Sequence, residues 1–298
     1  MARIACVVAL ALFLVGGARA AVVGPQRVLV VQATWGAELF PPAVVQKAYA
    51  DASDLLRRAS FGRAWLDVTI APPIAIPGYS CSLSSPLVED SIDQIRVPAR
   101  AAGYDVAAPD HVVYMIPSPV FGATACPNIS YAGLRDVVLV GSADPIGIVH
   151  ELGHTFGLGH ATTAACPTCE PLPYGDPWSP MGHGRSDFTV FEKVQLGWAL
   201  PPVDVRTSGT YTVAVDRRAS SAPAALRVHG RDGDLWIEYT TSPFRWVLVR
   251  RVVGTVRPDT VLFEPLRAGV TRVASDVTVQ ILQRLTIRAV VRVRLTAP

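Results

Sequence analysis

Three of the chain's six histidines fall within one short window, at His150, His154 and His160. On a helix, residues four apart lie on the same face, about one turn from each other. The rings of His150 and His154 can therefore reach a single metal ion, and imidazole nitrogen is a common ligand of Zn²⁺. This window constrains the fold more than any other part of the chain, because it needs a helix that ends between His154 and His160.

The neighbouring residues favour a helix on independent grounds. Asp144 can cap the first turn, and Pro145 suits the first helical position. Val149, Leu152 and Phe156 form an apolar stripe that such a helix can bury. We therefore predict a helix that begins near Pro145 and carries the first two histidines.

His160 lies six residues beyond His154, which is the wrong phase for the same helical face. Gly157 resolves this conflict, because glycine readily adopts the left-handed conformation that ends a helix and turns the chain. The chain can then return His160 to the metal as a third ligand. Three protein ligands leave one position for water, as in catalytic zinc sites. Glu151, next to His150, is placed to accept a proton from that water.

The complete pattern His150-Glu-x-x-His154-x-x-Gly157-x-x-His160 resembles the signature of the metzincin zinc peptidases. A His-Glu-x-x-His string alone also arises by chance on surface helices, but the offsets of the later glycine and histidine argue against chance. Metzincins also carry a methionine in a tight turn beneath the metal. Met181 lies in a Pro/Gly-rich segment downstream and matches that position.

Within the metzincins, the chain is most similar to the gametolysin-type secreted peptidases. The similarity rests on His160-Ala161 and on the segments 174–182 and 191–198, which read Tyr-Gly-Asp…Met-Gly and Lys…Leu-Gly-Trp. It is strong over residues 136–198 and weaker upstream. Immune inhibitor A-type peptidases share parts of the later stretch and are the nearest alternative.

The resemblance implies a fold and a mechanism. An amino-terminal subdomain would carry a mixed sheet and the zinc helix, and an irregular subdomain from Gly157 onward would carry His160 and Met181. Substrate would lie extended between them and pair with an edge strand, expected near 129–134. One zinc ion would polarise the scissile carbonyl, while Glu151 activates water and passes its proton to the leaving amine. Met181 would be a packing residue and not a ligand.

The chain departs from the family in two respects. Some metzincins have a tyrosine two residues after the turn methionine, where this chain has His183. His183 could ligate zinc, stabilise the oxyanion or be an exposed loop residue, and Tyr174 is a second candidate for the oxyanion role. Many relatives carry a propeptide with a zinc-blocking cysteine. Only residues 21–25 separate the predicted signal cleavage from the first strand, and none is cysteine, so we expect no such latency.

The amino terminus has the pattern of a secretory signal peptide. A basic start is followed by a continuous apolar run over residues 4–15, too short for a membrane-spanning helix, and by a small-residue site that predicts cleavage after Ala20. A buried amino-terminal helix is the alternative. We expect no membrane span in the mature chain and a secreted, periplasmic or extracellular location.

Cysteine usage agrees with export. Cys81, Cys126, Cys166 and Cys169 remain after signal cleavage, and an even number in an exported chain suggests two disulfides with three possible connectivities. Cys166-Pro-Thr-Cys169 could instead be a redox pair or half of a zinc site. A structural zinc site would need a second close pair, however, which the chain lacks.

The order of predicted elements indicates an α+β protein with two parts. Before the histidine window, strands at 26–34, 64–70, 111–116 and 136–140 alternate with helices at 42–60 and 91–102. Beyond residue 200 the chain shows only strand signals, at 210–215, 225–228, 235–240, 246–253, 260–263 and 287–295. We therefore expect a catalytic domain over residues 21–200 and a β-sandwich-like domain over 201–298.

Charge narrows the range of partners. The chain has 27 basic and 24 acidic residues, so electrostatic attraction to nucleic acid or anionic membrane is not expected. The sequence predicts a monomeric, secreted zinc endopeptidase with a protein or peptide substrate. One alternative is a catalytically silent protein whose carboxy-terminal β-region binds glycan or protein. Another is a zinc hydrolase that acts on a non-peptide bond.

Overall fold

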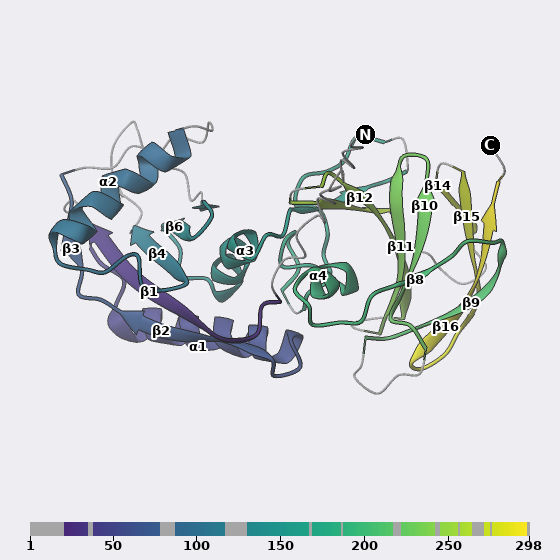
Figure 1. Cartoon of the computed structure of the whole chain (residues 1–298), viewed down its shortest axis with the longest axis horizontal. Coiled ribbons are helices and arrows are strands. Elements are labelled where there is room, and N and C mark those ends of the chain that lie inside the picture. The colour runs from purple at the N-terminus through teal and green to yellow at the C-terminus, as the bar shows by residue number, and fades with distance from the viewer. Residues whose placement is uncertain are drawn as a thin grey trace, which may run out of the picture.

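The computed structural model describes residues 21–34, 38–77, 87–116, 130–166, 169–185, 187–216, 222–241, 245–255, 257–263, 271–274 and 276–296. Within them, one end of the elongated molecule combines helices with a sheet and the other end is built of strands (Figure 1). The predicted signal peptide, Cys81 and Cys126 lie outside the described residues. No helix in the described part of the chain is long and apolar enough to cross a membrane.

The first sheet is mixed, as predicted. Its strands are β1 (Gly24–Thr34), β2 (Ala64–Ile70), β3 (Ile74–Ala75), β4 (His111–Ile116), β5 (Tyr131–Ala132) and β6 (Asp136–Val140). The order is β2-β1-β4-β6-β5, with β3 also paired to β1. The pairs β1–β2, β1–β4 and β4–β6 are parallel, whereas β5 runs antiparallel to β6 at the edge. This edge strand falls inside the range 129–134 where we expected one.

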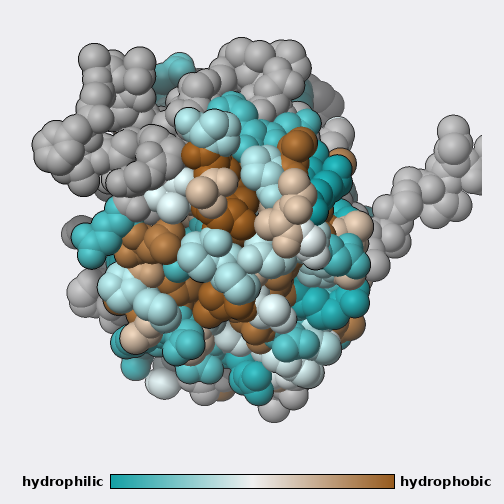
Figure 2. Space-filling model, turned by 90° about the vertical axis from the view of Figure 1, so that its left-hand side faces the viewer, coloured by the Kyte–Doolittle hydropathy of each residue, from teal (hydrophilic) through white to brown (hydrophobic). Residues whose placement is uncertain are grey.

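Helices cover both faces of this sheet. Helices α1 (Pro42–Ala59) and α3 (Pro145–Thr155) share a hydrophobic cluster with Val28 and Val30 of β1, whereas α2 (Leu87–Ala101) shares another with Val31 and Ala33. Alternate residues of a strand point to opposite faces, so the two clusters lie on opposite sides of the sheet. Figure 2 views this end of the molecule, where hydrophobic and hydrophilic residues are interspersed.

The strand-rich part contains two further sheets. Their strands are β7 (Ala161–Ala164), β8 (Val203–Asp204), β9 (Gly209–Ala214), β10 (Ala225–Gly230), β11 (Gly233–Thr240), β12 (Trp246–Val253), β13 (Asp259–Phe263), β14 (Thr271–Ala274), β15 (Val277–Arg284) and β16 (Arg288–Leu295). One sheet has the order β7-β13-β12-β11-β10-β8 and the other β14-β15-β16-β9. Side chains from both sheets, such as Ile237 and Val291, share one hydrophobic cluster.

The sequence pattern misses several elements of this part. It gives no strand at β7, β8, β14 or β15, and it predicts no helix at α4 (Val190–Gln195), a segment that it uses only for the family resemblance. β7 matters most, because it precedes residue 200 and yet pairs in parallel with β13. The predicted boundary at residue 200 therefore does not separate the sheets, since a strand from before it belongs to the carboxy-terminal sheet.

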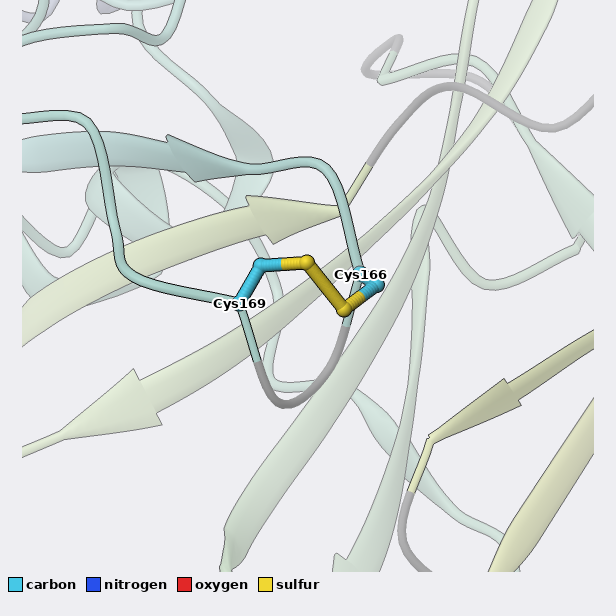
Figure 3. The surroundings of a disulfide bond; sticks show 2 residues. All are labelled: Cys166 and Cys169. Atoms are coloured by element: carbon cyan, nitrogen blue, oxygen red, sulfur yellow. A yellow bond between two sulfur atoms is a disulfide. The ribbon is translucent and has the colours of Figure 1, made fainter.

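A disulfide joins Cys166 and Cys169 in the loop that follows β7 (Figure 3). Their Cα atoms are 5.0 Å apart, within the range that disulfides bridge. This pairing agrees with the expected use of cysteine in disulfides. The other predicted disulfide would involve Cys81 and Cys126, outside the described residues.

Candidate metal centre

Helix α3 begins and ends close to where the sequence predicts. Pro145 is its first residue and Asp144 is the N-cap. The Asp144 side chain makes no capping hydrogen bond, contrary to our expectation. Its carboxylate instead accepts two hydrogen bonds, of 2.9 and 3.2 Å, from the guanidinium of Arg185. The helix ends at Thr155, and Gly157 has a φ of +93°, the left-handed conformation that we inferred for it.

The turn at Gly157 brings the three histidine rings together. Their candidate ligand atoms all lie within 4.8 Å of one another, and Nε2 of His150 is 3.2 Å from Nε2 of His154. The ring of His160 lies with its centroid 4.6 Å from that of His154 and 5.6 Å from that of His150. The structure thus assembles the set of rings that the sequence singled out.

Backbone carbonyls fix the tautomers of the first two rings. Nδ1 of His150 lies 2.8 Å from the carbonyl oxygen of Pro180, and Nδ1 of His154 lies 2.9 Å from that of Leu158. A carbonyl oxygen only accepts hydrogen bonds, so each Nδ1 donates and each Nε2 keeps its lone pair. Burial lowers the pKa of His150, and lowers that of His154 to about 3, which favours the neutral rings that bind metals.

This donor set fits a zinc ion. Three neutral imidazoles that converge on one point, each able to offer a nitrogen, are the ligands of several catalytic zinc sites. Glu151 provides a second test of the fit. Its side chain is buried, and Oε2 has no hydrogen-bond partner among the described residues. Burial raises the pKa of Glu151 to about 8, and a cation nearby would favour the charged carboxylate. The cluster is therefore compatible with a zinc site.

Met181 lies beneath the helix. It is fully buried in the same cluster as Leu152 and Leu158. A Cβ atom added to Gly153 would collide with its sulfur, so the methionine packs directly against the helical backbone. The turn around Met181 is tied to the chain after His160, since Ala161 N donates to the Met181 carbonyl at 2.9 Å.

The structure distinguishes Tyr174 from His183, the two candidates for stabilising the oxyanion. The ring centroid of Tyr174 lies 4.5 Å from that of His160 and 5.9 Å from that of His150. Tyr174 has a φ of +57°, uncommon for a non-glycine residue, and its side chain is about half exposed. Nδ1 of His183 instead lies 2.9 Å from the Tyr174 carbonyl oxygen. Among the described residues, His183 is not part of the metal-ligand cluster.

Sequence reasoning missed the carbonyls of Pro180 and Leu158, because a main-chain acceptor has no signature of its own. The one sequence feature that could have indicated the Pro180 contact is its position directly before Met181. A turn beneath the metal brings its backbone close to the ligands, so the residue before the methionine was a reasonable candidate for such a contact.

No family model matches the chain, and no curated protein matches it. Among solved structures, the chain is similar to one from a chaperone–substrate complex, with 16% identity and a TM-score of 0.36. The match covers 55% of this chain and 32% of that one, so the chain spans about a third of that protein.

Two further structures are similar to the chain at comparable scores. The zinc-dependent peptidase from Methanocorpusculum labreanum has 15% identity and a TM-score of 0.32, with 57% of this chain and 99% of that chain covered. Archaemetzincin from Methanopyrus kandleri has 18% identity and a TM-score of 0.31, with 58% and 94% covered. TM-scores this low identify no family, so the functional argument rests on the residues of the site.

Proposed function

We propose that the chain is a secreted zinc-dependent endopeptidase of the metzincin type, most like the gametolysin-type peptidases. One observation carries this proposal. Three histidine rings converge with their ligand atoms within 4.8 Å, and the helix that supplies two of them also supplies a buried carboxylate, Glu151, that lacks a partner among the described residues. Three nitrogens with an adjacent carboxylate are the parts that hydrolysis at a metal requires.

In this proposal His150, His154 and His160 hold the ion and Glu151 is the general base. When bound at such a site, Zn²⁺ lowers the pKa of water and polarises a carbonyl oxygen. Glu151 accepts a proton from the attacking water and later donates it to the leaving amine. Burial raises the pKa of Glu151, which makes the carboxylate a stronger base, and a cation nearby would keep it charged and ready to accept the proton.

Tyr174 is the candidate for stabilising the oxyanion. Its ring lies beside the rings of His150 and His160, and a phenol donates one hydrogen bond. Burial raises the pKa of Tyr174, and the charges of Glu151 and Asp259 act in the same direction, so its hydroxyl keeps its proton. A protonated donor at this place can stabilise negative charge that develops on the carbonyl oxygen.

Substrate is proposed to bind along the edge strand β5. This strand lies beside the helix of the candidate centre, because Ala132 packs against the hydrophobic cluster that includes Val149 and Leu152 of α3. An extended peptide can pair with such an edge through main-chain hydrogen bonds. The occupant is therefore a protein or peptide segment in an extended conformation.

Secretion and domain division are part of the same proposal. We propose residues 1–20 as the signal peptide, 21–200 as the catalytic domain and 201–298 as a β-sandwich-like domain. Separate hydrophobic clusters around α3 and around the two carboxy-terminal sheets support two cores, with Ala164 of β7 packed in the second one. Met181 is assigned a packing role, which agrees with its burial against Gly153.

The Glu151→Gln variant tests the catalytic assignment. Glutamine keeps the size of the side chain but cannot accept the proton, so hydrolysis of a peptide library should fall about 10²–10⁴-fold while zinc content stays near one ion per chain. The matched control is Glu170→Gln, a carboxylate in the loop after Cys169. Undiminished cleavage by Glu151→Gln would refute the role of Glu151. If the zinc-loaded wild type cleaves no peptide, the silent binding protein becomes the better interpretation.

A further inference from the structure

A strand of the carboxy-terminal sheet binds the backbone of the third histidine on both sides. The Asp259 carboxylate accepts a 2.6 Å hydrogen bond from His160 N, across 99 residues of sequence. Thr260 N in turn donates a 2.9 Å hydrogen bond to the His160 carbonyl. Both polar groups of the His160 main chain are thus held by the first two residues of β13.

The contact continues on either side of His160. Strand β7, which follows directly, pairs with β13 from Ala161 opposite Thr260 to Ala164 opposite Phe263. Gly159, which precedes the histidine, allows the close approach. A Cβ atom there would collide with the Asp259 carboxylate and would lie 2.6 Å from the Pro258 carbonyl oxygen. The whole segment from Gly159 to Ala164 is therefore held by β13.

A second contact of the same sheet holds the turn around Met181. Arg250 on β12 is fully buried and lies between two carboxylates, with Nη2 2.9 Å from Asp176 and Nη1 2.7 Å from Glu238. Asp176 begins the turn: its side chain accepts from Trp178 N at 2.8 Å, and its carbonyl accepts from His183 N at 3.1 Å. The carboxy-terminal sheet thus fixes both segments that follow the helix.

The three rings are therefore held differently. His150 and His154 are fixed by the helix and by carbonyls at Nδ1, whereas His160 lies beyond the helix end, where no helical hydrogen bonds set its main chain. We infer that Asp259 is a positioning residue for His160, and that the carboxy-terminal sheet is an integral part of the metal centre. A hydrogen bond to a carboxylate is charge-assisted and stronger than one between neutral groups, so it suits this task.

This inference concerns metal binding and does not need peptide hydrolysis. Partners that orient ligands typically change metal affinity 10–100-fold when removed. We expect Asp259→Ala to raise the dissociation constant for Zn²⁺ by that factor, measured by competition with a chelator, without substrate and without reductant so that the Cys166–Cys169 disulfide stays intact. Asp259→Asn keeps an oxygen acceptor but loses the charge, and should weaken binding about threefold to tenfold.

The control is Asp276→Ala. Asp276 lies in the same β-rich part and accepts a hydrogen bond from the main chain of Arg231 at 3.3 Å. Its replacement should leave zinc affinity within twofold of the wild type. An equal loss of affinity in both alanine variants would mean general destabilisation and would overturn the inference.

A double-mutant cycle separates positioning from other effects. If Asp259 acts through His160, the Asp259→Ala change should have no further effect on zinc affinity in a His160→Ala background. An undiminished effect there, or a single variant within twofold of the wild type, would overturn the inference. If Asp259→Ala does not fold, the Asp259→Asn variant provides the same cycle with the same criteria. These zinc-affinity measurements remain valid even if the wild-type protein cleaves no peptide.

Discussion

Helix α3 and the segment that follows it contribute to one cluster of rings, but different parts of the molecule hold them. The histidines of α3 are four residues apart, so helical geometry places their main chains and brings the two rings together. The Pro180 carbonyl then orients the ring of His150. His160 lies on a segment held by a strand that is 99 residues away in sequence. The comparison teaches that the main chain of two ligands is placed by a helix, whereas the main chain of the third is placed by the folded carboxy-terminal sheet.

The strongest test of this comparison breaks the buried contact between the two parts. Arg250→Ala would leave Asp176 and Glu238 buried without their cation, which typically costs about 3–5 kcal/mol of the free energy of unfolding. Urea unfolding at neutral pH measures this loss. Arg288→Ala, at an exposed position of β16, is the control and should change stability by less than about 0.5 kcal/mol. If Arg250→Ala lowers the free energy of unfolding by less than about 1 kcal/mol, the carboxy-terminal sheet does not anchor the turn around Met181.

A smaller effect is expected from two matched glycine substitutions. Gly159→Ala should push β13 away from His160 and weaken zinc binding about tenfold, since its Cβ collides with Asp259. Gly147→Ala lies on α3, where a Cβ meets nothing within 4 Å. Alanine is the better helix former there by about 0.5–1 kcal/mol, so zinc affinity should hold and stability should rise slightly. Equal zinc affinity in the two variants would contradict the view that His160 depends on contact with β13 while the α3 histidines do not.

The smallest effect concerns an exposed ion pair in the amino-terminal part. Arg27 and Asp110 pair at 2.8 Å, and hydrogen bonds from Arg27 lower the pKa of Asp110 to about 2. Because this folded-state pKa lies below the unfolded value of about 3.9, the pair stabilises the fold above about pH 4. That contribution is lost as the pH falls towards 2. Solvent screening keeps this contribution small.

The Asp110→Asn protein supplies the reference for this titration. The difference in unfolding free energy between wild type and Asp110→Asn should be constant near neutral pH and shrink between about pH 4 and 2. Together with the Arg250→Ala result, this measurement compares the stability contributed by an exposed arginine–aspartate pair with that contributed by a buried one. A difference that grows on acidification would contradict the assigned sign.

Much of the fold could be predicted because its signals are local. The strands β2, β4 and β6 have the predicted bounds, and α1 differs by one residue at its end. On β16, Ala289, Val291 and Val293 are buried while Arg288 and Arg294 are exposed, which follows the alternation of apolar and basic residues along the strand. Periodicity of two or 3.6 residues is written directly in the sequence, so such elements are readable without the tertiary structure.

The failures share a physical cause. Asp144 has the right type and position for a cap, yet its carboxylate pairs with Arg185, which lies 41 residues away. β7 is short and reads Ala-Thr-Thr-Ala, so nothing in its composition marks the pairing with β13. Competition between local and distant partners is decided by which groups meet in the folded chain, and sequence spacing does not report that.

The sequence by itself determined the set of three histidines, the adjacent glutamate and the glycine that ends the helix, because these depend on residue type and helical phase. Only the tertiary structure decided how His160 is held, that Tyr174 and not His183 lies beside the rings, and that β7 joins the carboxy-terminal sheet. These depend on hydrogen bonds and ion pairs between groups up to about 100 residues apart. Such contacts form only when the chain has packed, and they leave no periodic trace along it.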